Sequence, residues 1–376
     1  MRAHGLVTAV GVGLALAGCV ALAGCAAGPA PASGPVPPSG PGAQAPSGGL
    51  GPGGAPGSGA QACAPTVAID SYSDVLDKTN FAGTYVGNLS SLDVDTDGSL
   101  LALSDRSALF SLDPRTYRPT GVVALADENG RPLDSEGLAV DRDGSRLITS
   151  EVEPSVRRYN RDGRLLGRLP VPDSLRVAPA GRASTNLTFE GLTLQPDGRT
   201  LVASMEAALS GDQGNLVRFQ TWTRAGAGPG SGSFGLGVQY GYAVDPGLGV
   251  SELRATGDGR LLVLERGYVP GLGNTIRLYL ADLGGASDVS GVQDLTQRPP
   301  VQLIRKTLLA DLGHCPTLGA TARERQVNPL LDNIEGLAVT GRAPDGALRL
   351  LLVSDDNQST NQTTRLYTLT THLPTP

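Results

Sequence analysis

Histidine, cysteine and lysine are scarce in this chain, and their scarcity argues against several familiar kinds of active site. The 376 residues include three histidines and four cysteines, and no G-x-S-x-G motif is present. His314 adjoins Cys315 and His372 lies near the C-terminus, so we expect both histidines to be surface or structural residues. A Ser-His-Asp triad is therefore not expected. The absence of an H-x-x-x-H motif and of clustered cysteines argues equally against a zinc site.

Aromatic residues are few and long helical periodicity is absent, which argues against a helical fold. Only 4% of the residues are aromatic, and the apolar residues occur in short runs bounded by Gly, Asp and Pro. Examples are Leu100–Leu103, Leu147–Thr149, Leu261–Leu264 and Leu348–Val353. Runs of this length and setting are typical of β-strands, so the sequence predicts an all-β domain.

The N-terminus has the pattern of a bacterial lipoprotein signal. A short apolar run over residues 6–17 is followed by small residues before Cys19 and again before Cys25. Cleavage before Cys25 leaves one further pair of cysteines, whereas cleavage before Cys19 leaves an additional thiol. We therefore predict a signal peptide over residues 1–24 and lipid attachment at Cys25, with Cys19 as the alternative. The protein is then expected to be exported and anchored to a membrane, on its periplasmic or cell-surface face.

Two further segments follow the signal. Residues 25–62 are almost wholly Gly, Pro, Ala and Ser and carry no charge, so they are predicted to form a disordered tether. Residues 63–376 are predicted to form one domain. The whole chain has a formal net charge of −6, and its acidic residues fall on this domain, because the tether is neutral. Nucleic acid is therefore not expected as a partner.

The domain repeats one pattern: an acid before an apolar strand, an Asp-Gly turn, and a second apolar strand that ends in another acid. The clearest copies run from Glu136 to Glu151 and from Glu190 to Glu206. Looser copies begin at Ser91, Glu252 and Glu335. Each copy is predicted to be a β-hairpin. Copies spaced roughly 45–85 residues apart indicate a repeat architecture.

The geometry of a hairpin places the two acids of each copy side by side, at the end away from the turn. If the hairpins close radially, as in a propeller, these ends gather at one mouth. The first strands would contribute Glu136, Glu190, Glu252 and Glu335, and the second strands Asp105, Glu151, Glu206, Glu265, Asp355 and Asp356. Crowded carboxylates require protonation or a cation, and the oxygen ligands favour Ca²⁺. The alternative is that each carboxylate accepts backbone hydrogen bonds from the next repeat and holds the ring closed.

Closure of the ring can also be predicted. The last repeat supplies three strands before the chain ends, and residues 66–72 could add a fourth from the start of the domain. The sequence thus predicts a β-propeller of five or six blades, closed by pairing of N-terminal and C-terminal strands. A disulfide between Cys63 and Cys315 would fasten this closure. The alternative is that the two cysteines are free or that one is the lipid site.

Several motifs together resemble the phytase-like domain family, described by an esterase-like activity of phytase. They are Gly87–Asp93, Leu103–Arg106, Phe189–Leu192, Ser204–Glu206, Leu264–Gly267, Ile276–Tyr279, Asn333–Leu337 and Ser354–Asn357. The resemblance extends from about Tyr85 to Leu369. It implies a propeller that holds calcium with carboxylates at one mouth and binds phosphate there through Lys and Arg. Lysine is limited to Lys78 and Lys306 in this domain.

The function predicted from these features is metal-dependent hydrolysis of a small phosphoester or other ester by a monomeric, lipid-anchored protein. Glu190 and Glu335 are the predicted catalytic acids, and Arg106 and Arg266, each directly after a predicted mouth acid, would meet an anionic group. Two alternatives remain open. One is a non-catalytic propeller that binds a ligand or partner at the cell surface, with calcium as a structural ion. The other is a lactonase-like metal hydrolase.

Overall fold

The computed structural model describes residues 59–225, 232–296 and 300–375. The predicted signal peptide, Cys25 and residues 26–58 of the predicted tether lie outside the described residues. Within the described residues the first strand, β1, begins at Gln61, two residues before the predicted domain boundary at Cys63. No helix in the described part of the chain is long and apolar enough to span a membrane.

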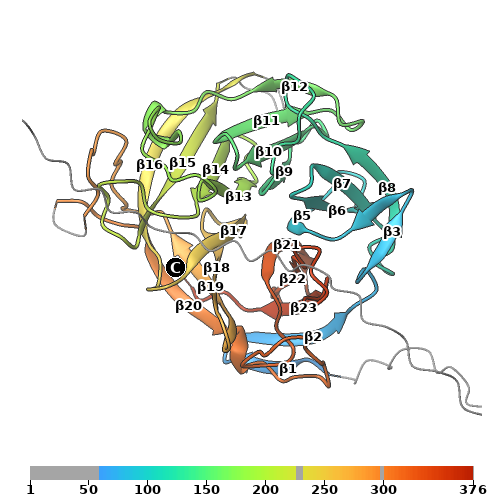
Figure 1. The fold of residues 1–376 in the computed structure, drawn as a ribbon. Helices are drawn as coiled ribbons and strands as arrows, with labels where there is room; N and C mark the ends of the chain where they lie inside the picture. Colours follow the sequence, from blue (N-terminus) through green and yellow to red (C-terminus); the bar gives the residue numbers. More distant parts are fainter. Residues whose placement is uncertain (1–58, 226–231, 297–299, 376) are drawn as a thin grey trace, which may run out of the picture. The chain divides into compact units, whose positions relative to one another are not determined.

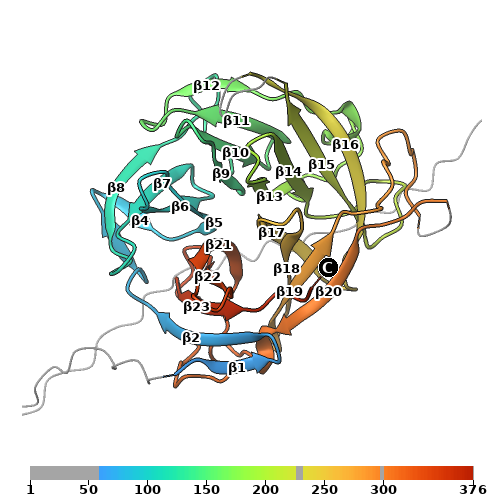
Figure 2. The ribbon, with the colours of Figure 1, turned by 180° about the vertical axis from the view of Figure 1, so that it is seen from behind.

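Strands dominate the described residues, and two short 3-10 helices, η1 (Asp173–Leu175) and η2 (Leu312–His314), accompany them. The prediction of an all-β domain is therefore confirmed. Five antiparallel sheets surround a central axis as blades, each with one strand nearest the axis (Figures 1 and 2). The fold is a five-bladed β-propeller. A separate two-stranded hairpin consists of β3 (Thr79–Phe81) and β4 (Thr84–Val86).

The blades are numbered in chain order, and the strands of each blade are given from the innermost outward. Blade 1 contains β5 (Leu89–Val94), β6 (Leu100–Ser104), β7 (Ala108–Leu112) and β8 (Pro119–Ala124). Blade 2 contains β9 (Leu138–Val140), β10 (Arg146–Ser150), β11 (Ser155–Tyr159) and β12 (Leu165–Arg168). Blade 3 contains β13 (Phe189–Leu194), β14 (Thr200–Met205), β15 (Leu216–Arg224) and β16 (Phe234–Ala243). Blade 4 contains β17 (Gly249–Ala255), β18 (Leu261–Val269), β19 (Gly273–Asp282) and β20 (Arg305–Asp311).

Blade 5 closes the ring with strands from both ends of the domain. It contains β21 (Ile334–Arg342), β22 (Leu348–Ser354) and β23 (Leu366–Thr371), followed by β2 (Val67–Ser73) and β1 (Gln61–Ala64). β2 pairs antiparallel with β23, and the two lie side by side in Figure 1. The predicted closure is confirmed. The predicted disulfide is also present, and it joins Cys63 on β1 to Cys315, which follows η2 and blade 4.

The core lies between the blades, because each blade packs one face on its neighbour. Leu262 and Leu264 of blade 4, for example, lie in one cluster with Leu350 and Leu352 of blade 5, and all four are buried. Residues on the other face, such as Leu261, pack toward blade 3. Both faces of β18 are thus covered, which explains its continuous apolar run. Burial of each leucine contributes roughly 1.5–3 kcal/mol.

Near the axis the inner strands approach each other closely, and glycine makes this possible. A Cβ atom built on Gly191 would lie 2.5 Å from the backbone nitrogen of Leu253 in the next blade. One built on Gly336 would lie 2.7 Å from Val353 and 3.1 Å from the Cα atom of Ser91. The glycine after the acid in the repeated pattern therefore serves packing around the axis.

Candidate functional site

The strand register shows which residues of the five blades are equivalent. Leu92, Leu138, Leu192, Leu253 and Leu337 occupy matching places on the inner strands, paired with Ala102, Ile148, Ala203, Val263 and Leu352 on the second strands. Just before these leucines, at the same mouth of the propeller, stand Ser90, Glu136, Glu190, Ser251 and Glu335. Three positions after each of these second-strand partners stand Asp105, Glu151, Glu206, Arg266 and Asp355. We call these ten residues the mouth set.

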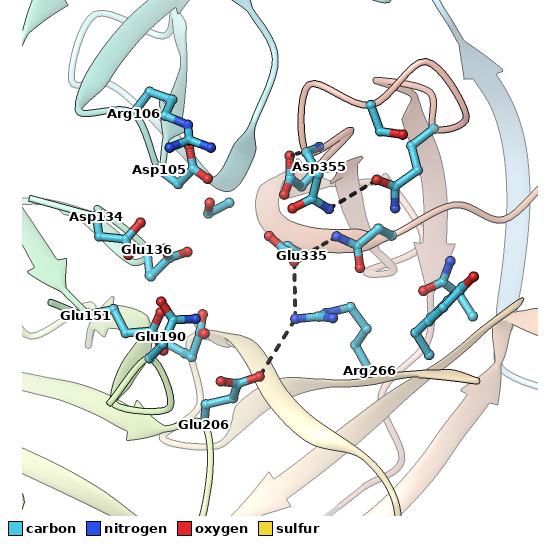
Figure 3. Close-up of a pocket in the computed structure, with 18 of the residues that line it drawn as sticks. Asp105, Arg106, Asp134, Glu136, Glu151, Glu190, Glu206, Arg266, Glu335 and Asp355 are labelled. Atoms are coloured by element: carbon cyan, nitrogen blue, oxygen red, sulfur yellow. Dashed lines mark hydrogen bonds and ion pairs between the residues drawn. The ribbon is translucent and has the colours of Figure 1, made fainter. Parts of the chain in front are cut away.

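All of the mouth set except Ser251 line one cavity of about 640 Å³. Asp134 and Arg106 line it as well. Figure 3 shows the acids of blades 1 to 3 along one side, with Glu335, Asp355 and Arg266 facing them. The structure therefore brings together seven of the ten predicted ligand acids, and both predicted arginines, as follows: Asp105, Glu136, Glu151, Glu190, Glu206, Glu335 and Asp355, with Arg106 and Arg266.

The other three predicted acids, Glu252, Glu265 and Asp356, do not line this cavity. Each is displaced by one residue from the mouth set, and a displacement of one residue in a strand turns the side chain to the opposite face. Blade 4 consequently presents Ser251 and Arg266 at the places where other blades present acids. The expectation that these three acids share the mouth is corrected by the register.

Glu252 lies on the axis, where its hydrogen bonds join blades. Its Oε1 atom accepts from the backbone nitrogens of Leu192, at 3.2 Å, and Leu253, at 3.0 Å. Its Oε2 atom accepts from Ser91 Oγ and, at 3.0 Å, from Arg254. The Arg254 guanidinium in turn donates to the backbone oxygens of Leu92, Leu192 and Leu337 on three other inner strands. Glu252 thus performs the structural role that the sequence left open as an alternative.

Glu265 and Asp356 are also held by partners away from the cavity. Glu265 accepts hydrogen bonds from Tyr242 at 2.7 Å and from Lys306 at 2.6 Å. Asp356 accepts from Lys78 and Tyr85, and these hydrogen bonds lower its pKa although burial opposes them. Both carboxylates are therefore engaged by protein groups.

Glu136 and Glu190 differ from these acids in having no protein donor. Both are 8% exposed, and within the described residues neither carboxylate accepts a hydrogen bond or forms an ion pair. Burial, and then repulsion from Glu335, raises the pKa of Glu136 well above its usual value. Burial, and then repulsion from Glu136, does the same to the pKa of Glu190. Buried charges without partners are costly, so these two positions call for a cation or for protons.

The remaining mouth acids have one or two partners each. Glu151 accepts from the Thr188 backbone nitrogen at 3.1 Å, and burial followed by repulsion from Glu206 raises its pKa to about 7. Burial raises the pKa of Asp105 to about 6. Arg266 lies 3.1 Å from Glu335 and 3.8 Å from Glu206, and Figure 3 shows it between them. Its guanidinium links blade 4 to the acids of blades 3 and 5.

Two overlapping groups of acids are close enough to hold a metal ion. One is Asp134, Glu136 and Glu151, the other is Glu151, Glu190 and Glu206, and in each group one oxygen per residue lies within 4.8 Å of the others. Oxygen ligands of Ca²⁺ lie about 2.3–2.6 Å from the ion, so ligands of one ion are at most roughly 5 Å apart. The donor set consists of carboxylate oxygens, which suits a hard cation. Glu136, which has no protein donor, belongs to the first group, and Glu190, which also has none, belongs to the second.

Several residues of the cavity were not predicted from the sequence. Asp134, Ser90 and Asn274 are among them, and amide side chains such as Asn333 and Asn357 also line the wall. Ser90 could have been found by aligning the repeats on their inner-strand leucines rather than on their acids. Asp134 and Asn333 come from connections between blades, and Asn357 from the loop between β22 and β23 of blade 5. The repeated pattern carries no information about these segments.

A comparison with known sequence families identifies the family of this chain. The family described as phytase-like, with an esterase-like activity of phytase, matches residues 84–358. The chain belongs to this family. The resemblance found in the sequence motifs is therefore confirmed.

The individual proteins and structures that resemble this chain share little sequence identity with it. An uncharacterized secreted protein from Arthroderma benhamiae is 29% identical over 117 aligned positions, which cover 24% of this chain and 23% of that protein. A gluconolactonase from Xanthomonas campestris has a TM-score of 0.39 and 15% identity, over 77% of this chain and 73% of that one. The PQQ-bound aldose sugar dehydrogenase from Streptomyces coelicolor has a TM-score of 0.38 and 14% identity, over 80% and 98%. At such TM-scores the two structures carry no argument about activity.

Proposed function

We propose that this protein is a calcium-dependent hydrolase that cleaves a phosphoester or another ester in the acidic cavity. The observation that carries the proposal is the pair of buried carboxylates, Glu136 and Glu190, that face the cavity without a protein donor. A fold that only needed these acids to hold its blades together would give them partners, as it does for Glu252. Membership of the phytase-like family supports the same activity.

Glu151 is the residue that would join two ion positions, because it belongs to both groups of acids. Asp134 and Glu136 would complete one position, and Glu190 and Glu206 the other. A bound calcium ion would supply Lewis acidity, which polarises an ester and increases the acidity of water. The negative carboxylates would compensate the charge of such an ion, and binding of the ion would remove the repulsion among the carboxylates.

Arg266 is placed to stabilise negative charge that develops on the substrate. It is held between Glu335 and Glu206, so its guanidinium has a fixed position on the cavity wall. Glu335 orients Arg266 and accepts a hydrogen bond from Asn333 at 2.9 Å. Arg106 has an exposed side chain beside Asp105 and could contact an anionic group that enters from solvent.

Hydrolysis with and without calcium tests the proposal. Purified protein would be assayed against phosphate esters, carboxyl esters and lactones, in chelator and in Ca²⁺. Calcium-dependent turnover that falls at least 100-fold in Glu151→Gln is expected, because this change removes one charge from both groups. Glu153→Gln, at an exposed glutamate outside the cavity, is the matched control. Calcium binding without turnover of any compound would leave a calcium-stabilised binding propeller as the better account.

We also propose that the protein is exported and attached to a membrane by a lipid on Cys25. The disulfide supports export, because such bonds persist in oxidising compartments. The secreted relative from Arthroderma benhamiae supports it as well. Cys25→Ser should release the protein from membranes, and Cys19→Ser should not. Labelling with a lipid precursor that survives Cys25→Ser and is lost in Cys19→Ser would assign the anchor to Cys19.

A further inference from the structure

Two polar atoms on the cavity wall have no partner, and neither belongs to the acids that would hold a metal. Ser90 on β5 is 2% exposed and Asn274 on β19 is 1% exposed, yet both line the cavity. Within the described residues, Ser90 Oγ and Asn274 Oδ1 form no hydrogen bond. A buried polar atom without a partner costs about 1–3 kcal/mol. Ser90 and Asn274 line this one cavity from two different blades, so a ligand there would complete both atoms once the side chains turn toward it.

The composition of the cavity wall limits what this ligand can be. Among the described residues, the ring of Tyr268 lines the cavity but no aliphatic side chain does, so an acyl chain would find little apolar surface there. Nine carboxyl groups line it against two guanidinium groups. Both guanidinium groups are paired with acids, Arg266 with Glu335 and Glu206 and Arg106 with Asp105, so the cavity offers little unpaired positive charge. A polyanion would therefore meet mainly negative charge.

The uncharged part of the wall is suited to hydroxyl groups. Asn274 Oδ1 is an acceptor and needs a donor, which a phosphate oxygen or an ester oxygen cannot provide. Ser90 Oγ can both donate and accept. Further amide and hydroxyl side chains, Asn186, Asn333, Asn357, Ser359, Asn361 and Gln362, line the same cavity. Hydroxyl groups can pair with all of these, and their oxygens are also suitable ligands for calcium.

We propose that the substrate is a polyhydroxylated, sugar-like ester with at most one anionic group, and that Ser90 and Asn274 bind its hydroxyl groups. This inference rests on the proposed function for the reaction and deepens it by naming the substrate class. A sugar lactone and a sugar monophosphate both fit this chemistry. Inositol hexakisphosphate and apolar esters do not fit it, the first because of its charge and the second because the wall is polar except for Tyr268.

The first test compares substrates and ligands on the calcium-loaded protein. We expect hydrolysis of gluconolactone or glucose phosphate with kcat/KM at least 10-fold above that for inositol hexakisphosphate and for p-nitrophenyl butyrate. Calorimetry should show binding of gluconate, a polyhydroxylated monoanion, whether or not any ester is turned over. Gluconate binding without hydrolysis would count against the proposed function alone. Preference for the hexakisphosphate or the butyrate ester, or no gluconate binding, would overturn the substrate class.

The second test uses the unpartnered atoms themselves. Ser90→Ala and Asn274→Ala should raise KM, or the Kd for gluconate, by about 3- to 10-fold, with a much smaller change in kcat. Ser204→Ala is the matched control, because Ser204 Oγ is equally buried and unpartnered but does not line the cavity. Ser90→Ala should not lower the melting temperature, since it removes no hydrogen bond. Unchanged KM and gluconate affinity in both variants would show that the two residues do not bind substrate.

Discussion

At the scale of single residues, acids in nearly the same sequence context have opposite environments. Glu252 is surrounded by four donors on the axis, whereas Glu190, in the neighbouring blade, has none. The difference follows from a displacement of one residue relative to the inner-strand leucine. In the first position the hydrogen bonds of the carboxylate join the blades, although burial raises the pKa of Glu252 to about 7; charge in the second position is tolerated only with a cation or a proton.

Replacement of each acid by glutamine should separate these roles. In chelator at pH 8, Glu252→Gln should lower the free energy of unfolding by about 2–4 kcal/mol, because Arg254 loses its buried counter-charge. Glu190→Gln should leave the free energy unchanged or raise it, because repulsion among the mouth acids falls. Chemical denaturation of both variants measures the difference. Equal destabilisation by the two changes would contradict the separation.

The raised pKa values of the mouth acids also predict how stability depends on pH. The pKa of Asp105 is about 6 and that of Glu151 about 7 in the folded protein, above the values near 4 expected in the unfolded chain. The folded state therefore holds protons more tightly, and this stability is lost as pH rises through 6 and 7. In chelator, the free energy of unfolding should fall by a few kcal/mol between pH 5 and pH 8. Calcium should reduce the fall, and a free energy that rises over this range in chelator would contradict the account.

At the scale of elements, the inner strands and their register decide what the mouth contains. The hairpins, the Asp-Gly turns and the direction of the strands could be predicted from alternation and turn chemistry. Gly98 and Gly144, for example, adopt positive φ values of 86° and 80° in their turns. The acids of blade 4 could not be placed in the same way, because Glu252 and Glu265 look like members of the pattern and only pairing with the second strand reveals the displacement.

Contacts between blades also could not be predicted from the repeated sequence pattern. The amides of the wall and Asp134 come from connections that differ from blade to blade, so no repeat predicts them. Arg254 appears in the sequence as one basic residue in a strand, and its role as a donor to three other inner strands depends on closure of the ring. Long-range geometry of this kind is set by packing and not by local propensity.

The close approach of inner strands gives a prediction for glycine. Gly191→Ala should lower the free energy of unfolding by about 2–4 kcal/mol, because the added methyl group meets backbone atoms of Glu252 and Leu253 that cannot move independently. Gly167→Ala on β12 is the control, since nothing lies within 4 Å of a Cβ atom there. Denaturant titration of both variants checks the prediction. A cost for Gly191→Ala no greater than that for the control would show that the inner strands can separate.

At the scale of the whole molecule, the ring is closed by β2 pairing with β23 and fastened by the disulfide. The bond joins residues separated by 252 positions, at the edge of blade 5 and the end of blade 4. Loop-entropy arguments assign such a bond about 4–5 kcal/mol, although long loops often give less. The double variant Cys63→Ser, Cys315→Ser should lose 2–5 kcal/mol, measured by denaturation under oxidising conditions. The wild type in reductant should lose a similar amount, and no loss in either case would mean that strand pairing alone closes the ring.

The central claim is that the acidic mouth of this propeller holds calcium. Calorimetric titration of Ca²⁺ into chelator-treated protein, with thermal melts of the same samples, tests it most directly. We predict binding heat for the wild type and a stabilisation of about 2.7 kcal/mol when free calcium is 100 times the Kd. Glu190→Gln should bind more weakly and gain less. A wild-type protein with no binding heat and the same melting temperature in chelator and in calcium would contradict the claim.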